Sequence, residues 1–220
     1  MDEPYVSPLG TKEHWSSAYV EEINQFHNNR TQVGEIWFGR DIQKKIISYI
    51  ISHFKDKSIS VLDIGFGNGI FLYKLAKNKY KNLYGIDYVS SSLTLAQEIF
   101  KEKGKKNNEE YDIKIYQEDI NNKTDQIQIQ FDLIHDKGSL DAFLLNKDNS
   151  LDNYIKYVLS YSKKGETYFL ITSCNNTREE LMEKFTEEKG FKFIDEIKNR
   201  SFQFGGKEGQ RVATQLYKII

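Results

Sequence analysis

Residues 61–69 read Val-Leu-Asp-Ile-Gly-Phe-Gly-Asn-Gly, and this stretch decides the fold that the sequence predicts. Its apolar, partly β-branched first half predicts a buried strand, and the three glycines that follow predict a loop. Because glycine lacks a Cβ and tolerates positive φ, a ligand can approach the backbone of such a loop closely. In doubly wound sheets, ligands bind beyond the carboxyl ends of the strands, which is where this loop would lie.

The spacing of the glycines indicates which ligand the loop suits. A dinucleotide site has the pattern Gly-x-Gly-x-x-Gly, in which the third glycine lets the helix pass close to the pyrophosphate. In this chain the glycines are Gly65, Gly67 and Gly69, and Ile70 takes the place of that third glycine. Such a loop after Asp63 fits a nucleoside that carries an amino-acid group, because there is no pyrophosphate to bind. A dinucleotide site and a simple tight turn remain the alternatives at this point.

Strands and helices alternate along the rest of the chain. Apolar residues at helical spacing predict helices over residues 42–54, 71–76, 93–100, 151–161 and 177–189. Short apolar runs predict strands over residues 59–64, 82–86, 113–116, 131–135, 167–172, 191–197 and 212–219. This order predicts an α/β, Rossmann-like fold with a mostly parallel seven-stranded sheet, helices on both faces and a C-terminal antiparallel hairpin. Other doubly wound domains share the pattern.

Length and composition bound the class of protein. The 220 residues contain no Pro-, Gly- or Ser-rich linker, so residues 41–220 are expected to form one domain. The 31 basic and 32 acidic side chains nearly cancel, so no strong field favours nucleic acid or an anionic membrane. A lone cysteine and the lack of any apolar run of ~20 residues predict a soluble, cytoplasmic protein, and we expect a monomer. No metal is expected, because metal-ligand spacing is absent among Cys174, His14, His27, His53 and His135.

Two carboxylates follow the next two predicted strands and extend the nucleoside site. Asp87, with Tyr88 after it, ends a strand eighteen positions after Gly69 and could accept hydrogen bonds from both ribose hydroxyls, or it could only cap the next helix. Asp119 could accept from the adenine amino group and Ile120 could contact the ring, or the two could belong to a capped polar turn. With the glycine loop, these residues favour S-adenosylmethionine as the ligand and methyl transfer as the reaction.

Polar residues also end the fourth predicted strand, where residues 131–141 read Phe-Asp-Leu-Ile-His-Asp-Lys-Gly-Ser-Leu-Asp. Methyl transfer from a sulfonium is a direct displacement, so the protein mainly has to align a neutral acceptor. If the acceptor is a lysine, desolvation in an apolar channel would lower its pKa from the reference value of about 10.4. We hypothesise that Asp136 is the catalytic residue that holds and orients this amine. Lys137 and Asp141 could contact the substrate or form a salt-bridged strand end.

An aromatic segment precedes the first predicted core helix. Residues 34–39 read Gly-Glu-Ile-Trp-Phe-Gly, and Trp37 is expected to contact the cofactor. The segment could simply pack on the domain, or it could be a flap that closes over the cofactor and shields it from water. Both descriptions can hold together. Residues 1–40 are therefore expected to form an N-terminal segment that packs over the cofactor site.

These motifs, in this order, resemble those of the elongation factor 1-alpha lysine methyltransferases, a family of the seven-β-strand class. The resemblance covers nearly the whole chain, and its narrowest pieces are the tryptophan segment at 34–39 and the Asp-Lys-Gly-Ser segment at 136–139. Its other pieces are residues 14–19, 62–69, 85–88, 169–175 and 202–206. The resemblance implies S-adenosylmethionine as cofactor, S-adenosylhomocysteine as product and a lysine of elongation factor 1-alpha as the group that is methylated.

The resemblance also assigns residues to the site. It implies that Asp136 lies beside the transferred methyl group and that the cofactor is contacted by Gly65, Gly67, Asn68, Gly69, Asp87, Tyr88, Asp119 and Ile120. Asp63 and Trp37 complete the predicted cofactor site. Two other readings stay open: a methyltransferase of the same fold that acts on another protein or a small molecule, and a non-catalytic module that only binds the cofactor.

Overall fold

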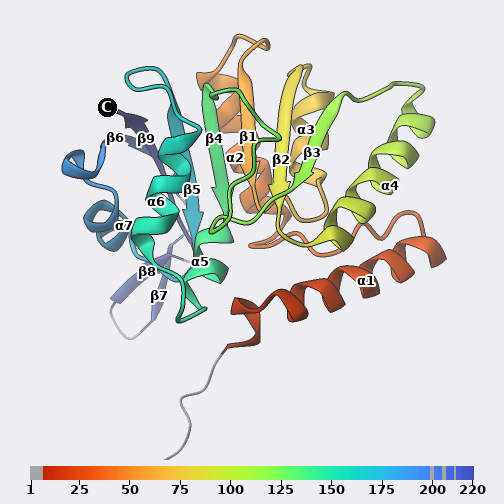
Figure 1. Cartoon of the computed structure of the whole chain (residues 1–220), viewed down its shortest axis with the longest axis horizontal. Helices are drawn as coiled ribbons and strands as arrows, with labels where there is room; N and C mark the ends of the chain where they lie inside the picture. The colour runs from red at the N-terminus through yellow and green to blue at the C-terminus, as the bar shows by residue number, and fades with distance from the viewer. Residues whose placement is uncertain (1–6, 199–200, 205–206, 211) are drawn as a thin grey trace, which may run out of the picture.

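A seven-stranded sheet with helices on both faces forms the centre of the computed structural model (Figure 1). The structure describes the backbone of residues 7–198, 201–204, 207–210 and 212–220, and the side chains of residues 7–198 and 212–220. Its strands are β1 (Ser60–Ile64), β2 (Asn82–Asp87), β3 (Ile113–Gln117), β4 (Leu133–Lys137), β5 (Tyr168–Ser173), β6 (Phe191–Glu196), β7 (Ser201–Phe204), β8 (Lys207–Gln210) and β9 (Ala213–Ile219). Its helices are α1 (Lys12–Asn28), α2 (Arg40–His53), α3 (Ile70–Lys77), α4 (Ser90–Asn107), α5 (Ser139–Leu144), α6 (Leu151–Ser160) and α7 (Arg178–Lys184), with short 3-10 turns η1 (Pro8–Gly10) and η2 (Glu187–Lys189).

Strand β1 lies inside the sheet, whose order is β3-β2-β1-β4-β5-β9-β6. The pairs β1–β2, β2–β3, β1–β4 and β4–β5 are parallel, and β9 pairs antiparallel with both β5 and β6. This topology confirms the predicted α/β, Rossmann-like fold with a mostly parallel sheet and an antiparallel C-terminal end. Parallel pairing brings the carboxyl ends of β1 to β4 to one edge of the sheet, so the residues that follow these strands meet there.

Apolar side chains on the two faces of the sheet form two cores. Side chains alternate along β1, so that Val61 belongs to one core while Leu62 and Ile64 belong to the other. Helices α2, α3 and α4 close the first core, and α6 and α7 close the second. The apolar residues found at helical spacing in the sequence are the ones that face the core. Ile46 and Ile50 of α2, for example, are both fully buried.

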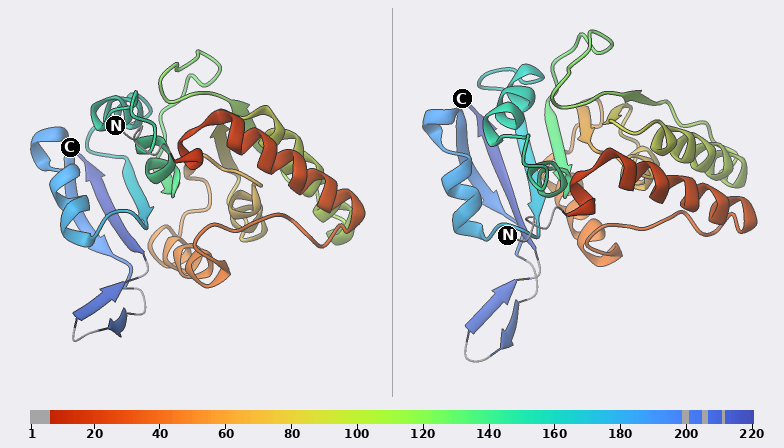
Figure 2. Two further views of the ribbon diagram at one scale, coloured as in Figure 1. Left: turned by 90° about the horizontal axis from the view of Figure 1, so that it is seen from below. Right: turned by 60° about the horizontal axis from the view of Figure 1, so that its bottom comes forward.

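Helix α1 crosses the edge of the sheet at which the parallel strands end (Figures 1 and 2). It packs alongside α4, where a carboxylate oxygen of Glu98 lies 2.6 Å from His27 and 3.4 Å from Arg30. The turn η1 before it lies against α5. Residues 7–39 therefore lie over the end of the sheet where the sequence predicts the ligand.

Two predicted elements in the C-terminal part differ from the structure. The helix predicted over residues 177–189 ends at Lys184, because Phe185 leaves helical geometry (φ −113°, ψ 79°) and buries its ring in the second core. The two strands predicted to form the C-terminal hairpin do pair, as β6 and β9. The glycine-rich turn predicted between them contains a further antiparallel hairpin, β7–β8.

One strand and two helices elsewhere in the chain also differ in detail from the prediction. The strand predicted over residues 131–135 begins at Leu133, and the carboxylate of Asp132 before it accepts from the N–H and the hydroxyl of Ser60. Helices α1 and α5 are not among the predicted helices; α1 has one buried side chain, Phe26, so its sequence carries little apolar pattern. Within the described residues, no helix has the length and apolar character needed to cross a membrane.

Candidate active site

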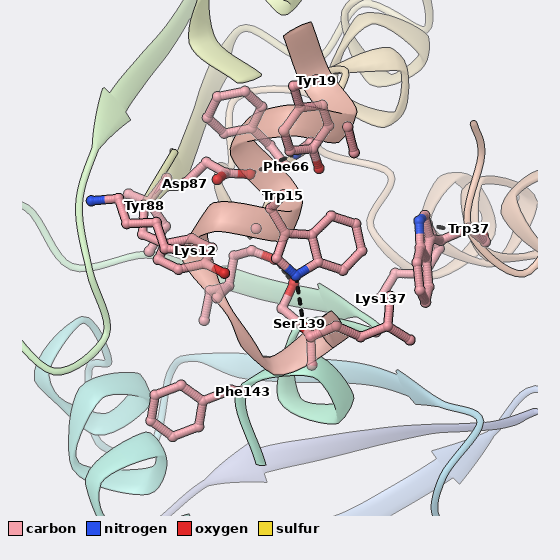
Figure 3. A pocket seen from close by; sticks show the side chains of 18 of the residues that line it. Lys12, Trp15, Tyr19, Trp37, Phe66, Asp87, Tyr88, Lys137, Ser139 and Phe143 are labelled. Carbon is pink, nitrogen blue, oxygen red and sulfur yellow. Dashed lines mark hydrogen bonds between the residues drawn. The ribbon is translucent and has the colours of Figure 1, made fainter. Parts of the chain in front are cut away.

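A pocket of about 540 Å³ lies between the carboxyl edge of the sheet and the N-terminal segment (Figure 3). Its floor comes from the glycine loop after β1, the ends of β2 and β4, the loop after β3 and the first residues of α5. Its cover comes from η1, α1 and residues 35–37. The predicted site residues that line it are Asp63, Gly65, Gly67, Asn68, Asp87, Tyr88, Asp119, Ile120, Trp37 and Lys137.

The first two glycines of the loop are required by close contacts. Gly65 has a φ of +65°, and a Cβ there would lie 2.1 Å from the hydroxyl oxygen of Ser139, which donates to the carbonyl oxygen of Ile64 at 2.7 Å. Gly67 has a φ of +58°, and its Cβ would lie 2.9 Å from the hydroxyl oxygen of Tyr19 on α1. The lack of side chains at both positions keeps the backbone of the loop accessible from the pocket.

Gly69 has a different role from the other two. It precedes α3 with a φ of +71°, and a Cβ there would lie 2.5 Å from the ring of Phe100 on α4. It does not line the pocket. The structure therefore places the third predicted glycine where two helices approach each other, away from the predicted ligand.

Asn68 fastens the glycine loop to the aromatic segment above it. Its amide nitrogen donates to the carbonyl oxygen of Glu35 at 2.8 Å, and its amide oxygen accepts from the N–H of Ile70 at 3.1 Å. The N–H of Glu35 donates at 2.7 Å to Glu22 on α1, where burial raises the pKa of the Glu22 carboxyl. The loop, the segment and α1 are thus joined at one point.

Asp87 ends β2 with its carboxylate in the pocket wall. It is 5% exposed and accepts from the N–H of Gly67 at 3.1 Å and of Val89 at 3.0 Å. Burial raises the pKa of Asp87 to about 6, although the two N–H groups act against the shift. The side chain therefore caps the turn after β2 and also lines the pocket, so the two alternatives drawn from the sequence do not exclude each other.

The loop after β3 forms the neighbouring wall. Asp119 and Ile120 line the pocket, and the carboxylate of Asp119 accepts from the N–H of Asn121 at 2.8 Å. The adjacent Glu118 carboxylate is 3% exposed and accepts from the hydroxyls of Tyr157 and Tyr161 at 2.5 and 2.6 Å. Burial alone would raise the pKa of Glu118, but its hydrogen bonds outweigh that effect and lower it. Asp119 is thus the carboxylate of this loop that remains available to a ligand.

Aromatic side chains of the N-terminal segment cover the pocket. The rings of Trp15 and Trp37 lie 5.0 Å apart, and Trp15 lies within 6.1 Å of Tyr19. The indole N–H of Trp15 donates to the carbonyl oxygen of Leu9 at 2.7 Å, which fixes the ring over the pocket. Sequence reasoning assigned no site role to Trp15 or Tyr19. Their spacing of four residues, which places two aromatic rings on one helix face, is the signal that points to them.

Lys137 is a partly buried cation in the pocket wall. Its ammonium donates to the carbonyl oxygen of Trp37 at 3.2 Å and lies 5.7 Å from the ring centre of Phe38. Burial lowers the pKa of Lys137, while the nearby carboxylates of Asp63 and Asp136 act against the shift. Lys137 therefore loses its proton more readily than a lysine in water.

Asp136 lies behind the pocket wall and does not line the pocket. Its fully buried carboxylate accepts from the N–H groups of Ser139 and Leu140 at 3.0 Å each and from the hydroxyl of Tyr154 at 2.5 Å. Burial raises the pKa of Asp136 to about 7; the charge of Asp141 adds to the shift, and the Tyr154 hydroxyl opposes it. All three donors come from within the fold, so the carboxylate holds the start of α5.

Asp141 also lies outside the pocket lining. Its carboxylate accepts from the hydroxyl of Ser173 at 2.5 Å and from the N–H of Cys174 at 2.7 Å. It therefore joins α5 to the end of β5. The predicted substrate contact at this position does not form part of the pocket wall, because the neighbouring strand end supplies the hydrogen-bond donors.

The residues of the pocket fit a nucleoside that carries an amino-acid group. Acceptor carboxylates stand at Asp63, Asp87 and Asp119, along the ends of three strands, and the glycine loop leaves backbone open between them. The volume and the aromatic cover suit a ligand that is largely enclosed. Across residues 7–198 and 212–220, no cluster of three His, Cys, Asp or Glu side chains is arranged to hold a metal ion.

Comparisons with known proteins show the family and the fold of the chain. A family model described as "Methyltransferase domain" matches residues 55–215. EEF1A lysine methyltransferase 2 of Homo sapiens is 40% identical over 214 residues, which cover 96% of this chain and 87% of the human protein. Protein-lysine N-methyltransferase EFM4 of Saccharomyces cerevisiae is 34% identical over 220 residues, which cover 94% of this chain and 93% of the yeast protein. The solved structure of magnesium protoporphyrin IX methyltransferase from Synechocystis PCC 6803 with bound SAM matches with a TM-score of 0.64 at 10% identity, over 98% of this chain and 99% of that one. That likeness shows the fold alone.

Proposed function

The chain belongs to the family of EEF1A lysine methyltransferases, which are S-adenosylmethionine-dependent protein-lysine N-methyltransferases, and from this premise we propose that it methylates a lysine of elongation factor 1-alpha. One observation carries the proposal. A single pocket combines the glycine loop and the Asp87 carboxylate on one side with an aromatic cover and Lys137 on the other. The first side suits a nucleoside, and the second suits a lysine side chain.

We propose that the residues on the first side hold the cofactor. Asp87 would accept from the ribose hydroxyls, Asp119 from the adenine amino group, and Ile120 would pack on the adenine ring. The backbone of Gly65 and Gly67 would lie against the amino-acid part, where no side chain intervenes. When bound, the cofactor supplies a methyl group on a positively charged sulfur.

The aromatic cover would prepare the acceptor lysine. Trp15 and Trp37 present apolar surface that removes water from an incoming side chain, and desolvation lowers the pKa of a lysine amine. Lys137, in the wall of the same pocket, already shows a pKa lowered by burial. A neutral amine aligned by these walls is the acceptor that a direct displacement requires.

Asp136 is proposed to act by positioning. Its carboxylate is committed to the start of α5 and to Tyr154, so it would set the place of Gly138 and Ser139 under the acceptor. This differs from the direct contact with the amine that we expected from the sequence. Lys137, predicted to contact the substrate, would hold Trp37 through its carbonyl group instead.

The N-terminal segment is proposed to be the cover of the site as well as part of its wall. Residues from η1, α1 and 35–37 line the pocket, so the ligand could enter only if part of this cover moves or if the end beside α5 stays open. The division into a covering segment, residues 1–40, and a domain, residues 41–220, remains a prediction. So do the monomeric state and the cytoplasmic location.

Transfer of a radiolabelled methyl group in a cell lysate tests the class of acceptor. Label is expected in a protein band of the size of elongation factor 1-alpha, and none is expected with an Asp87→Ala variant. Label in a metabolite fraction and in no protein would support the small-molecule alternative. Cofactor binding without any transfer would support the non-catalytic module.

A further inference from the structure

A buried histidine, His135, lies beside the glycine loop and contacts the Asp63 carboxylate of the pocket wall. Asp63 of β1 and His135 of β4 are direct neighbours in the parallel register. The Nδ1 atom of His135 lies 2.7 Å from one carboxylate oxygen of Asp63, and the two side chains are 0% and 4% exposed. A contact of this length between a ring nitrogen and a carboxylate requires a proton between them, so His135 donates through Nδ1.

The other contacts of His135 are apolar. Its ring stacks on Phe71 with 3.9 Å between centres and 13° between planes, and its buried Nε2 atom has no hydrogen-bond partner. A buried polar atom without a partner is costly, and an apolar residue would fill this core position without that cost. The single polar contact that His135 makes is therefore the one to Asp63.

One carboxylate oxygen of Asp63 is available to accept a hydrogen bond from a ligand. It lines the pocket directly before the glycine loop, and one of its oxygens is bonded to His135. For its second oxygen the described residues supply no hydrogen-bond donor. Lys137 is close enough for Asp63 to influence its pKa, yet its ammonium is bonded to the carbonyl oxygen of Trp37. A primary ammonium group is the ligand chemistry that suits a carboxylate left in this state.

We propose that His135 is a positioning residue that turns the free oxygen of Asp63 toward the α-ammonium group of the cofactor's amino-acid end. The inference rests on the proposed function, because it needs that cofactor in the pocket. The ε-ammonium of a substrate lysine has the same chemistry. Asp63 lies directly before the glycine loop, whose backbone is proposed to lie against the amino-acid part of the cofactor, and this place favours the cofactor.

Two variants separate the hydrogen bond from the packing. His135→Phe keeps a ring that can stack on Phe71 but has no donor. His135→Asn loses the ring but keeps an amide nitrogen at the place of Nδ1. Binding of S-adenosylhomocysteine and of its des-amino analogue is measured by calorimetry without any protein substrate, and the melting temperature of each variant is recorded.

His135→Phe is expected to bind S-adenosylhomocysteine about ten-fold more weakly, which is the scale of one hydrogen bond to a charged group, and to bind the des-amino analogue as wild type does. His135→Asn is expected to bind both ligands within about three-fold of wild type, although it melts at a lower temperature. Asp63→Asn is the substitute variant if His135→Phe does not fold. It is expected to bind S-adenosylhomocysteine no more tightly than the des-amino analogue.

Several results would overturn the inference alone. These are equal losses for both ligands in His135→Phe, binding in His135→Asn as weak as in His135→Phe, or an unchanged preference in Asp63→Asn. If His135→Phe and His135→Asn bind both ligands more weakly in proportion to the fall in their melting temperatures, His135 would be a packing residue. If the wild-type protein binds neither ligand, the proposed function falls as well.

Discussion

Replacing Asp87 with Asn is expected to weaken the binding of S-adenosylhomocysteine about 100-fold at pH 7.5. The carboxylate is 5% exposed and accepts from the N–H groups of Gly67 and Val89. An asparagine keeps the shape of the side chain and one acceptor oxygen, but it turns an NH₂ group toward the second partner. The change therefore removes a charged acceptor from the ribose without opening a cavity.

The magnitude follows from the hydrogen bonds that the ribose would lose. A hydrogen bond to a charged group contributes about 1.5–3 kcal/mol, and the remaining amide oxygen replaces part of this. A net loss of about 3 kcal/mol over two hydroxyls corresponds to about two factors of ten in Kd. Asp125→Asn, on an exposed carboxylate outside the pocket, is the matched control and should bind as wild type does.

The pH dependence of ligand binding gives a second test of Asp87. Burial raises the pKa of Asp87 to about 6, so its contribution to stability is present below the unfolded value and is lost as the pH rises through about 6. Ribose hydroxyls that donate to the carboxylate favour its ionised form, so binding should strengthen as the pH rises through the same value. Titration calorimetry from pH 5 to 8 measures this step, which Asp87→Asn should lack. Binding by Asp87→Asn within three-fold of wild type, at an unchanged melting temperature, would refute the reasoning.

Three further predictions concern the loop, the buried carboxylate and the cover. Gly65→Ala should lower the free energy of unfolding, measured in urea, by about 2–3 kcal/mol, because it strains the backbone and displaces the Ser139 hydroxyl. The control Gly165→Ala, at a φ of +77° with nothing within 4 Å, should lower it by only about 1 kcal/mol. Equal losses in the two variants would contradict the close contact at Gly65. Tyr154→Phe removes a hydrogen bond to Asp136 and should slow methyl transfer several-fold in a steady-state assay, with the affinity for S-adenosylhomocysteine unchanged. A change in that affinity alone would argue against the positioning role of Asp136. Trp15→Ala should speed the dissociation of S-adenosylhomocysteine about ten-fold in stopped-flow measurements, because the aromatic cover loses the Trp15 ring. An unchanged dissociation rate would show that the cover does not retain the ligand.

The parts of the fold that the sequence predicted are those with a strong periodic pattern. Buried strands such as β1 and helices such as α2 carry apolar residues at fixed spacing, and these residues are the core in the structure. Helix α1 escaped prediction because Phe26 is its one buried side chain and its other contacts are made by polar or half-buried residues. A helix that lies across the end of a sheet needs little apolar surface, so its pattern is weak.

The place of a side chain at the pocket was easiest to predict where the residue type fixes the local geometry. A carboxylate that ends a strand, as at Asp87, and glycines with positive φ, as at Gly65 and Gly67, lie where the sequence placed them. The direction of the Asp136 side chain depends instead on the turn after it, where Gly138 adopts a φ of +89° and brings the N–H groups of α5 back to the carboxylate. Contacts that depend on register between distant strands, such as Asp63 with His135, leave no local pattern to read.

The central claim is that this chain methylates a lysine of elongation factor 1-alpha through the pocket around Asp87. Mass spectrometry of purified elongation factor 1-alpha, after incubation with the protein and S-adenosylmethionine, tests it most directly. One peptide is expected to carry a lysine whose mass rises by about 14 Da for each methyl group that replaces a hydrogen. With Asp87→Asn at limiting cofactor, no such gain is expected. An unmodified elongation factor 1-alpha beside wild-type protein that binds the cofactor would contradict it.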